Sequence, residues 1–203
     1  MINPFAQGTP RTRDGKPNLA APAPRAKGRP DLSGVWQVEP ARPEADAITR
    51  KRASVDSPTV HCQPMGLPGP FLAAVPFKIV QTPGLTLILQ EVDNTIRRIY
   101  TDGRPLPVDP QPSWHGYSIG KWEGDTFVVD TAGFNDLSWL DAFGHPHSDA
   151  LRLQERFHRR DYGHLDIQIT LDDPKTFTKP LTIKVTDLLV PDSDIPYESA
   201  VTC

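Results

Sequence analysis

The sequence predicts an all-β protein, either an antiparallel β-barrel or a strongly curved sheet, preceded by a long proline-rich N-terminal arm. Three observations support this prediction. The 203 residues include 23 prolines, a residue type that helix interiors and central strands exclude. Apolar and polar residues alternate in many short segments, which is the pattern of half-buried strands. Tight turn signals separate most of these segments, as in strands joined by hairpins.

Eight or nine segments carry the strand pattern. Several end at turn signals, such as Pro83-Gly84, Asp102-Gly103 and the glycine loop 123–125. The expected strands are 34–38, 77–81, 85–89, 95–101, 117–122, 126–131, 151–157, 165–171 and 181–189. Short strands in hairpin succession favour closure into a barrel, and such barrels commonly enclose one small-ligand cavity.

The chain divides into an arm and one domain. Residues 1–31 contain six prolines and no apolar period, so we expect an extended or disordered arm. The arm either wraps the body or pairs with a second subunit in a homodimer. Residues 32–203 form the single barrel domain, in which proline-rich 40–76 is mostly loop with one short helix around 45–53.

The charge and the hydrophobic pattern of the sequence exclude several classes of binding partner. With 22 Lys+Arg against 25 Asp+Glu the formal net charge is −3, which argues against nucleic acid or an anionic membrane surface as a partner. Apolar runs such as 85–89 are too short to span a bilayer. The chain carries neither a glycine-rich phosphate loop nor a Gly-x-Ser-x-Gly elbow. A small molecule is therefore the expected partner, and no nucleotide cofactor is expected.

Glu155 is the first candidate for chemistry. It falls in phase with Leu153 and Phe157, and side chains two apart in a strand lie on one face. A carboxyl group inside a barrel is costly unless it is paired or protonated, and burial raises its pKa towards the range of general acid–base catalysis. Glu91, in phase with 85–89, is a weaker candidate of the same kind.

Arg98 offers an alternative role for Glu155. It shares a face with Ile96 and Tyr100, so it is the expected inward partner of the carboxylate. In a catalytic site Arg98 orients the carboxylate or stabilises developing negative charge. In a structural site the two side chains form a buried ion pair, and the sequence leaves both readings open.

The segment 139–164 holds four of the six histidines. His145 and His147 flank Pro146, and in an extended segment their rings point to the same side. One of them is the expected acid–base partner of Glu155. Together with His115 or Asp141 the two also make a candidate mononuclear metal site. Aromatic and polar groups expected to bind substrate are Trp114, His115, Tyr100, Trp139 and Asp141.

Cys62 and Cys203 lie outside any zinc-type spacing. They are either two free thiols or one disulfide that ties the C-terminus to the body. A loop of this length makes a disulfide worth roughly 4–5 kcal/mol in the chain-entropy model. The sequence starts without the basic and apolar regions of a signal peptide, so we expect either a cytosolic protein or a mature exported form.

Several segments of the sequence resemble known protein families. Residues 34–36 resemble the Gly-x-Trp entry strand of lipocalin-type barrels. Segments 30–36 (PDLSGVW), 120–131 (GKWEGDTFVVDT) and 144–148 (GHPHS) resemble a secreted bacterial family whose function is uncharacterised. This resemblance implies a periplasmic or secreted protein, and with it an oxidising compartment and the Cys62–Cys203 disulfide. It implies no catalytic residue.

Together these observations predict a cofactor-independent lyase or isomerase. It would act by acid–base catalysis on a small, largely apolar and possibly aromatic molecule in a barrel cavity. The alternatives are a non-catalytic lipocalin-like carrier, whose interior needs no convergent polar groups, and a mononuclear histidine-ligated metal enzyme.

Overall fold

The computed structural model describes residues 8–38, 61–73, 75–142 and 145–191. Nearly all its regular structure is β, as predicted, and the expected helix around 45–53 lies outside the described residues. The strands are β1 (Arg25–Ala26), β2 (Arg29–Pro30), β3 (Gly34–Val38), β4 (Phe77–Thr82), β5 (Leu85–Gln90), β6 (Thr95–Tyr100), β7 (Tyr117–Glu123), β8 (Thr126–Ala132), β9 (Arg152–Arg159), β10 (His164–Asp172) and β11 (Leu181–Leu189). The described residues also include the short helix α2 (Gly69–Leu72) and the 3₁₀ turn η2 (Val92–Asn94).

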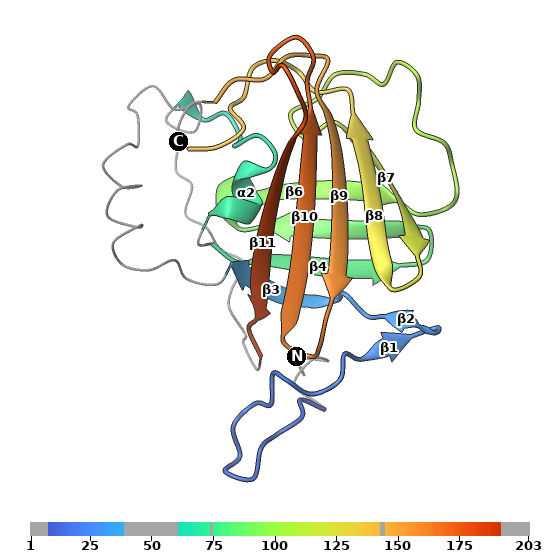
Figure 1. The fold of residues 1–203 in the computed structure, drawn as a ribbon, viewed down its shortest axis with the longest axis vertical. Coiled ribbons are helices and arrows are strands. Elements are labelled where there is room, and N and C mark those ends of the chain that lie inside the picture. The colour runs from blue at the N-terminus through green and yellow to red at the C-terminus, as the bar shows by residue number, and fades with distance from the viewer. Residues whose placement is uncertain (1–7, 39–60, 74, 143–144, 192–203) are drawn as a thin grey trace.

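Strands β3 to β11 close into a nine-stranded barrel in the order β10-β11-β3-β4-β5-β6-β7-β8-β9. The predicted barrel is thereby confirmed. Eight of its nine junctions are antiparallel, and the remaining one, between β6 and β7, is parallel. Figure 1 shows the barrel as two strand groups, with β8 to β11 crossing in front of β3 to β6 at a steep angle.

The interior of the barrel is filled by large side chains. Phe71 of α2 enters one end and packs edge to face on Phe77 and Phe157, with ring centroids 5.1 and 5.9 Å apart. A crevice lined by Phe127, Phe157 and neighbouring core residues has no room for a water molecule. The largest fully buried side chains include Trp36, Phe71, Phe77, Phe127, Phe134 and Phe157. The part of the core that the structure describes is therefore packed, and a ligand pocket must be sought at its edge.

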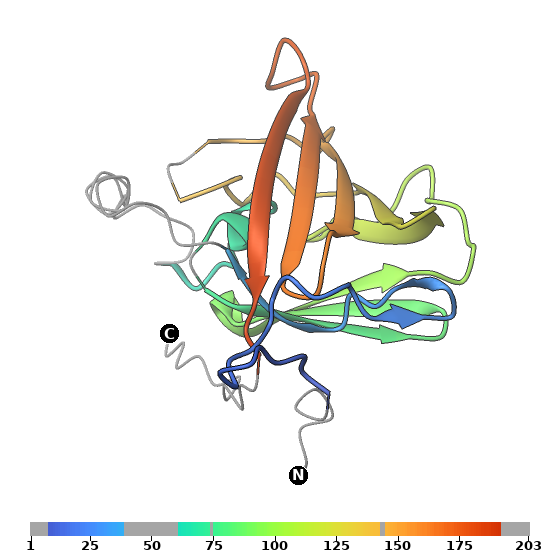
Figure 2. The same cartoon turned by 60° about the horizontal axis from the view of Figure 1, so that its bottom comes forward.

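Residues 8–31 run along the end of the barrel opposite α2 (Figure 2). The backbone N–H groups of Gly163 and Tyr162 donate to the carbonyls of Leu19 and Ala21 at 2.8 and 2.6 Å. A Cβ atom at Gly163 would overlap the Leu19 side chain, so this glycine permits the close approach. None of the helices in the described part of the chain has the length and apolar character to cross a bilayer.

Candidate functional site

The parallel junction between β6 and β7 is the weakest seam of the barrel. Only two register pairs join the strands, Ile99 with Ser118 and Tyr100 with Ile119, whereas β9 and β10 share eight. A parallel pair needs a long crossover connection, here residues 101–116. The antiparallel prediction is wrong at this one junction, because nothing in the pattern of 101–116 indicated that the chain returns in the same direction.

The chain just before β7 is hydrogen-bonded to the residues that follow β8. The N–H of Ser113 donates to the Gly133 carbonyl at 3.0 Å, and the Ser113 carbonyl accepts from Asn135 at 2.9 Å. Gly116 has a φ of +65°, and a Cβ atom there would lie 2.8 Å from the carbonyl oxygen of Ala132. Glycine thus lets this segment press against β8, which leaves an opening beside the first half of β6.

A pocket of about 280 Å³ occupies this opening. We call it the seam pocket and define it by six of its lining residues, Arg97, Arg98, Tyr100, Trp114, His115 and Tyr117. The rings of Tyr100 and Tyr117 stack with centroids 5.1 Å apart. The pocket opens to solvent, since Arg98 on its rim is exposed. Four residues that the sequence singled out, Arg98, Tyr100, Trp114 and His115, therefore lie together.

Arg97 forms a buried ion pair with Glu155 at the inner end of the seam pocket. Its Nη1 and Nη2 atoms donate to the two carboxylate oxygens at 2.7 and 2.5 Å, and the two side chains are 1% and 0% exposed. The guanidinium also donates to Ser118 Oγ at 3.1–3.2 Å and to Thr131 Oγ1 at 2.8 Å. Because these acceptors belong to β7, β8 and β9, one side chain bridges the seam where the ladder is short.

The predicted partner of Glu155, Arg98, is thus wrong by one position. Glu155 faces inward with Leu153 and Phe157, as expected. On β6, however, Arg97 and Ile99 are buried, while Arg98 is exposed and Ile96 is 52% exposed. The inward face of this strand carries the cation because the buried carboxylate requires a partner.

The hydrogen bond and the burial of His115 in the seam pocket define its tautomer and its protonation state. Its Nε2 lies 3.0 Å from the carbonyl oxygen of Met65. A carbonyl only accepts, so Nε2 carries the proton and the neutral ring presents Nδ1 as a base. Burial, helped by the Arg97 charge, lowers the pKa of His115 below its ordinary value of 6.5, although the Met65 carbonyl, Asp93 and Glu155 act in the opposite direction.

The other candidate histidines have separate partners. His145 is exposed, and its Nδ1 lies 2.7 Å from an oxygen of Asp141, beside an apolar pocket of about 180 Å³ near α2. His147 is buried, with Nε2 at 3.0 Å from Ser138 Oγ and Nδ1 at 3.1 Å from the Ser148 carbonyl. The structure pairs neither of them with Glu155. Their rings do not share a side as expected, because one is exposed and the other buried.

Of the expected metal ligands, Asp141 and His145 lie 2.7 Å apart, but no third one joins them in the described part of the chain. His115, His145 and His147 each bond a different group. Within the described ranges no three His, Cys, Asp or Glu side chains form a group able to hold a metal ion. Trp139 is half-buried and bridges Pro146 across the same loop as Asp141, so these two expected substrate-binding residues lie apart from the seam pocket. Glu91 is half-buried and lies just beyond β5.

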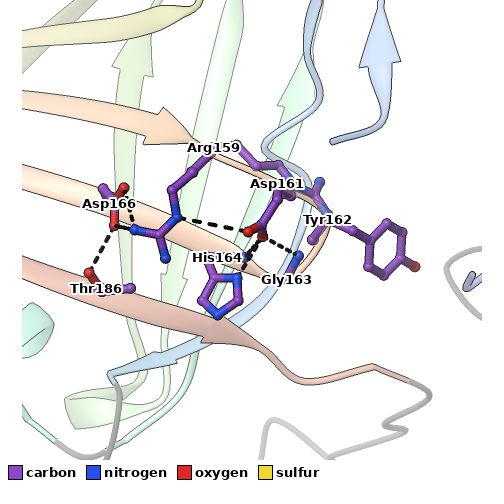
Figure 3. Close-up of polar contacts among 8 residues, drawn as sticks. Arg159, Asp161, Tyr162, Gly163, His164, Asp166 and Thr186 are labelled. Carbon is purple, nitrogen blue, oxygen red and sulfur yellow. Dashed lines mark hydrogen bonds and ion pairs between the residues drawn. The ribbon is translucent and has the colours of Figure 1, made fainter. Parts of the chain in front are cut away.

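The polar residues at the far end of β9 serve the hairpin turn. The Asp161 carboxylate accepts from the N–H groups of Gly163 and His164 at 3.1 and 2.9 Å and contacts His164 Nδ1 at 2.6 Å. Figure 3 shows these bonds. Beside them, Thr186 of β11 donates to Asp166 on the adjacent strand β10. The sequence cluster 139–164 thus divides between the two ends of the barrel and its interior.

Asp187 of β11 is another buried carboxyl group, and it was not among the residues predicted to be functional. It is 0% exposed, and neither of its oxygens has a hydrogen-bond partner among the residues that the structure describes. Burial alone raises its pKa to about 7. Asp187 pairs with Leu165 of β10, and Leu165 pairs in turn with Arg159 of β9. Arg159 does not bond the Asp187 carboxyl group but donates to the carbonyls of Asp31, Asp161 and Tyr162. The signal was available, since Asp187 continues the alternation of Ile183, Val185 and Leu189.

Comparisons with known proteins find no match to the chain among protein-family models, curated proteins or solved structures. The resemblance to a secreted family, and the export that it implies, stay predictions. Cys62 is described but Cys203 lies outside the described residues, so the disulfide also stays a prediction. The same holds for the homodimer through the arm.

Proposed function

We propose that the seam pocket binds a small, planar, largely apolar molecule and catalyses proton transfer on it without a cofactor, as a lyase or an isomerase does. The observation that carries the proposal is His115, whose lowered pKa and fixed Nε2–H tautomer supply a neutral base beside Arg97 in an open pocket. A group with a perturbed pKa in a cleft marks a functional site more often than a bare surface does.

The chemistry follows from these groups. Nδ1 of His115 takes a proton from a carbon next to a carbonyl group of the ligand, and the electron pair moves onto the carbonyl oxygen. The Arg97 guanidinium lines the same pocket and offers positive charge to that oxygen. The imidazolium then returns its proton to a different carbon in an isomerase, or protonates a departing group in a lyase. General acid–base catalysis of this kind contributes about 10²–10⁴-fold to a rate.

Glu155 has a positioning role in this proposal. Its two oxygens hold the Arg97 guanidinium in one orientation, as bidentate carboxylates do. Acid–base work is assigned to His115 because that ring lines the pocket, whereas the Glu155 side chain is 0% exposed. The rings of Tyr100, Trp114 and Tyr117 supply flat apolar contact for a planar ligand.

One observation favours a second function, binding without turnover. The Arg97 guanidinium already donates to Glu155, Ser118 and Thr131, so its hydrogen bonds are accounted for by a structural role that joins β6 to β7, β8 and β9. A carrier would then use the same pocket rather than a hollow barrel interior.

Hydrogen–deuterium exchange at carbon separates the two functions. A panel of small aryl ketones and aryl keto acids is incubated with the protein in D₂O, and deuterium incorporation next to the carbonyl is followed by NMR. We expect incorporation with the wild-type protein and a loss of about 10²–10⁴-fold in His115→Gln. Glutamine retains an N–H for the Met65 carbonyl, so the fold should be kept.

The matched control is His158→Gln, which removes an exposed histidine from β9 and should leave the exchange rate unchanged. Equal rates in wild type and His115→Gln would contradict the proposal. Binding of the panel in the pocket without any exchange by the wild-type protein would favour the carrier.

A further inference from the structure

Arg98 is a cation on the rim of the seam pocket whose charge no described acidic side chain neutralises. Two other arginines at this seam have acidic partners: Arg97 pairs with Glu155, and Arg104 Nη2 lies 2.6 Å from an oxygen of Asp102. Arg98 is exposed on the rim, and the structure gives it no acidic partner among the described residues. A guanidinium without a carboxylate partner is a site for an anion.

The acidic groups near the pocket do not compensate Arg98. No Asp or Glu side chain is among the described residues that line the pocket. Glu155 and Asp102 are engaged by their arginines, and Asp93 accepts the N–H of Met65 at 2.7 Å. The rim of the seam pocket therefore carries a positive charge that a ligand can neutralise.

The lining and the volume of the seam pocket restrict the size of the ligand that it can hold. Three aromatic rings line the pocket, and the guanidinium of Arg104 lies 4.0 Å from the Tyr100 ring centroid on this side of the barrel. The volume of about 280 Å³ is at the lower limit of pockets that hold drug-sized ligands. A molecule with a single ring fits this space, and its acidic group must reach the rim.

We propose that the seam pocket selects small monocyclic aromatic carboxylates, with Arg98 as the residue that binds the carboxylate. This inference rests on the proposed function for its site and gives the substrate class of that site. With the carboxylate held by Arg98 at the exposed rim, the ring extends towards His115 and the buried Arg97. The reacting carbon is then presented to the base and not to solvent.

Binding measurements test the inference without any assay of turnover. The full-length protein is titrated with phenylacetate and, in parallel, with its neutral isostere phenylacetamide, and backbone amide shifts are followed by NMR. We expect phenylacetate to shift resonances of residues 113–118 and to bind about 10- to 100-fold more tightly than the amide. The difference should shrink as salt is raised, because the rim charge is exposed.

Arg98→Gln should reduce phenylacetate affinity to that of phenylacetamide and leave amide binding unchanged. Arg152→Gln is the control, since Arg152 is an exposed arginine on β9 outside the pocket. Both variants alter exposed side chains, so their melting temperatures should equal that of the wild type. Equal affinity for acid and amide, or an Arg98→Gln variant that binds phenylacetate normally, would overturn the inference while leaving the proposed function intact. If neither compound shifts residues 113–118 at millimolar concentration, the site itself is wrong, and the proposed function fails with it.

Discussion

Of the buried carboxyl groups in the described residues, Glu155 and Asp187 lie on barrel strands, and their surroundings favour opposite charge states. Near the β6–β7 seam, Glu155 is held by the bidentate guanidinium of Arg97, with Ser118 and Thr131 as further acceptors. On β11, Asp187 is equally buried, but its oxygens have no hydrogen-bond partner within the described ranges, and its pKa rises to about 7. One region keeps an ion pair in the interior, whereas the other favours the uncharged acid.

The difference follows from how the strands are joined. The long ladders of β9, β10 and β11, with eight register pairs at each of two junctions, hold that side together. The β6–β7 seam has two pairs, so side-chain bonds from Arg97 to three strands replace missing ladder bonds. A short ladder also leaves the opening that forms the seam pocket. Polar side chains and access from solvent thus occur together because both result from the parallel junction.

The largest expected effect comes from removing the cation at the seam. Arg97→Met leaves Glu155 buried without a partner, and we expect it to lower the free energy of unfolding by about 3–5 kcal/mol. Replacing both partners in Arg97→Met/Glu155→Leu should restore most of that loss, because no charge then remains in the interior. Urea unfolding at neutral pH measures both variants. A single variant as stable as the wild type would show that the pair does not hold the seam.

A smaller effect on the free energy of unfolding is expected at Asp187, where the buried carboxyl group is favoured in its uncharged form. Between its ordinary pKa of 3.8 and its folded pKa of about 7, the folded protein holds a proton that the unfolded chain has released. This contribution to stability is therefore complete below pH 3.8 and is lost as the pH rises through 7. The total loss is up to about 4 kcal/mol for three pKa units.

Asp187→Asn should remove this pH dependence. Its free energy of unfolding, followed by urea titration from pH 5 to pH 9, should exceed that of the wild type above pH 7 and approach it at pH 5. Asp166→Asn is a control, because Asp166 is half-buried and bonded to Thr186 and Arg160. Parallel pH curves for wild type and Asp187→Asn would mean that the Asp187 carboxylate finds a partner in solution.

The sequence predicted the barrel and the inward direction of Glu155, because alternation fixes which side chains share a face. It failed at β6, where the segment 95–100 (TIRRIY) carries apolar residues in both phases and two adjacent arginines. Periodicity alone could not choose between Arg97 and Arg98. The parallel junction depends on the path of residues 101–116, for which the sequence has no repeating pattern.

The state of His115 was beyond sequence reasoning for a different reason. Its tautomer depends on the carbonyl of Met65, fifty positions away, and its burial depends on the closure of the seam. Asp187 was in phase with the apolar residues of β11, so its inward direction was predictable. That it lacks a partner depends on Arg159, which donates to backbone carbonyls near the arm instead.

The protonation state of the His115 ring tests most directly whether the β6–β7 seam holds a neutral base in an accessible pocket. Its two ring nitrogens can be followed by ¹⁵N NMR as the pH is lowered from 8 to 5, with His158→Gln and His115→Gln used to assign the signals. We expect an Nε2–H tautomer at pH 7 and, because burial lowers its pKa, a titration midpoint below 6.5. An imidazolium at pH 7, or a neutral ring protonated on Nδ1, would contradict it.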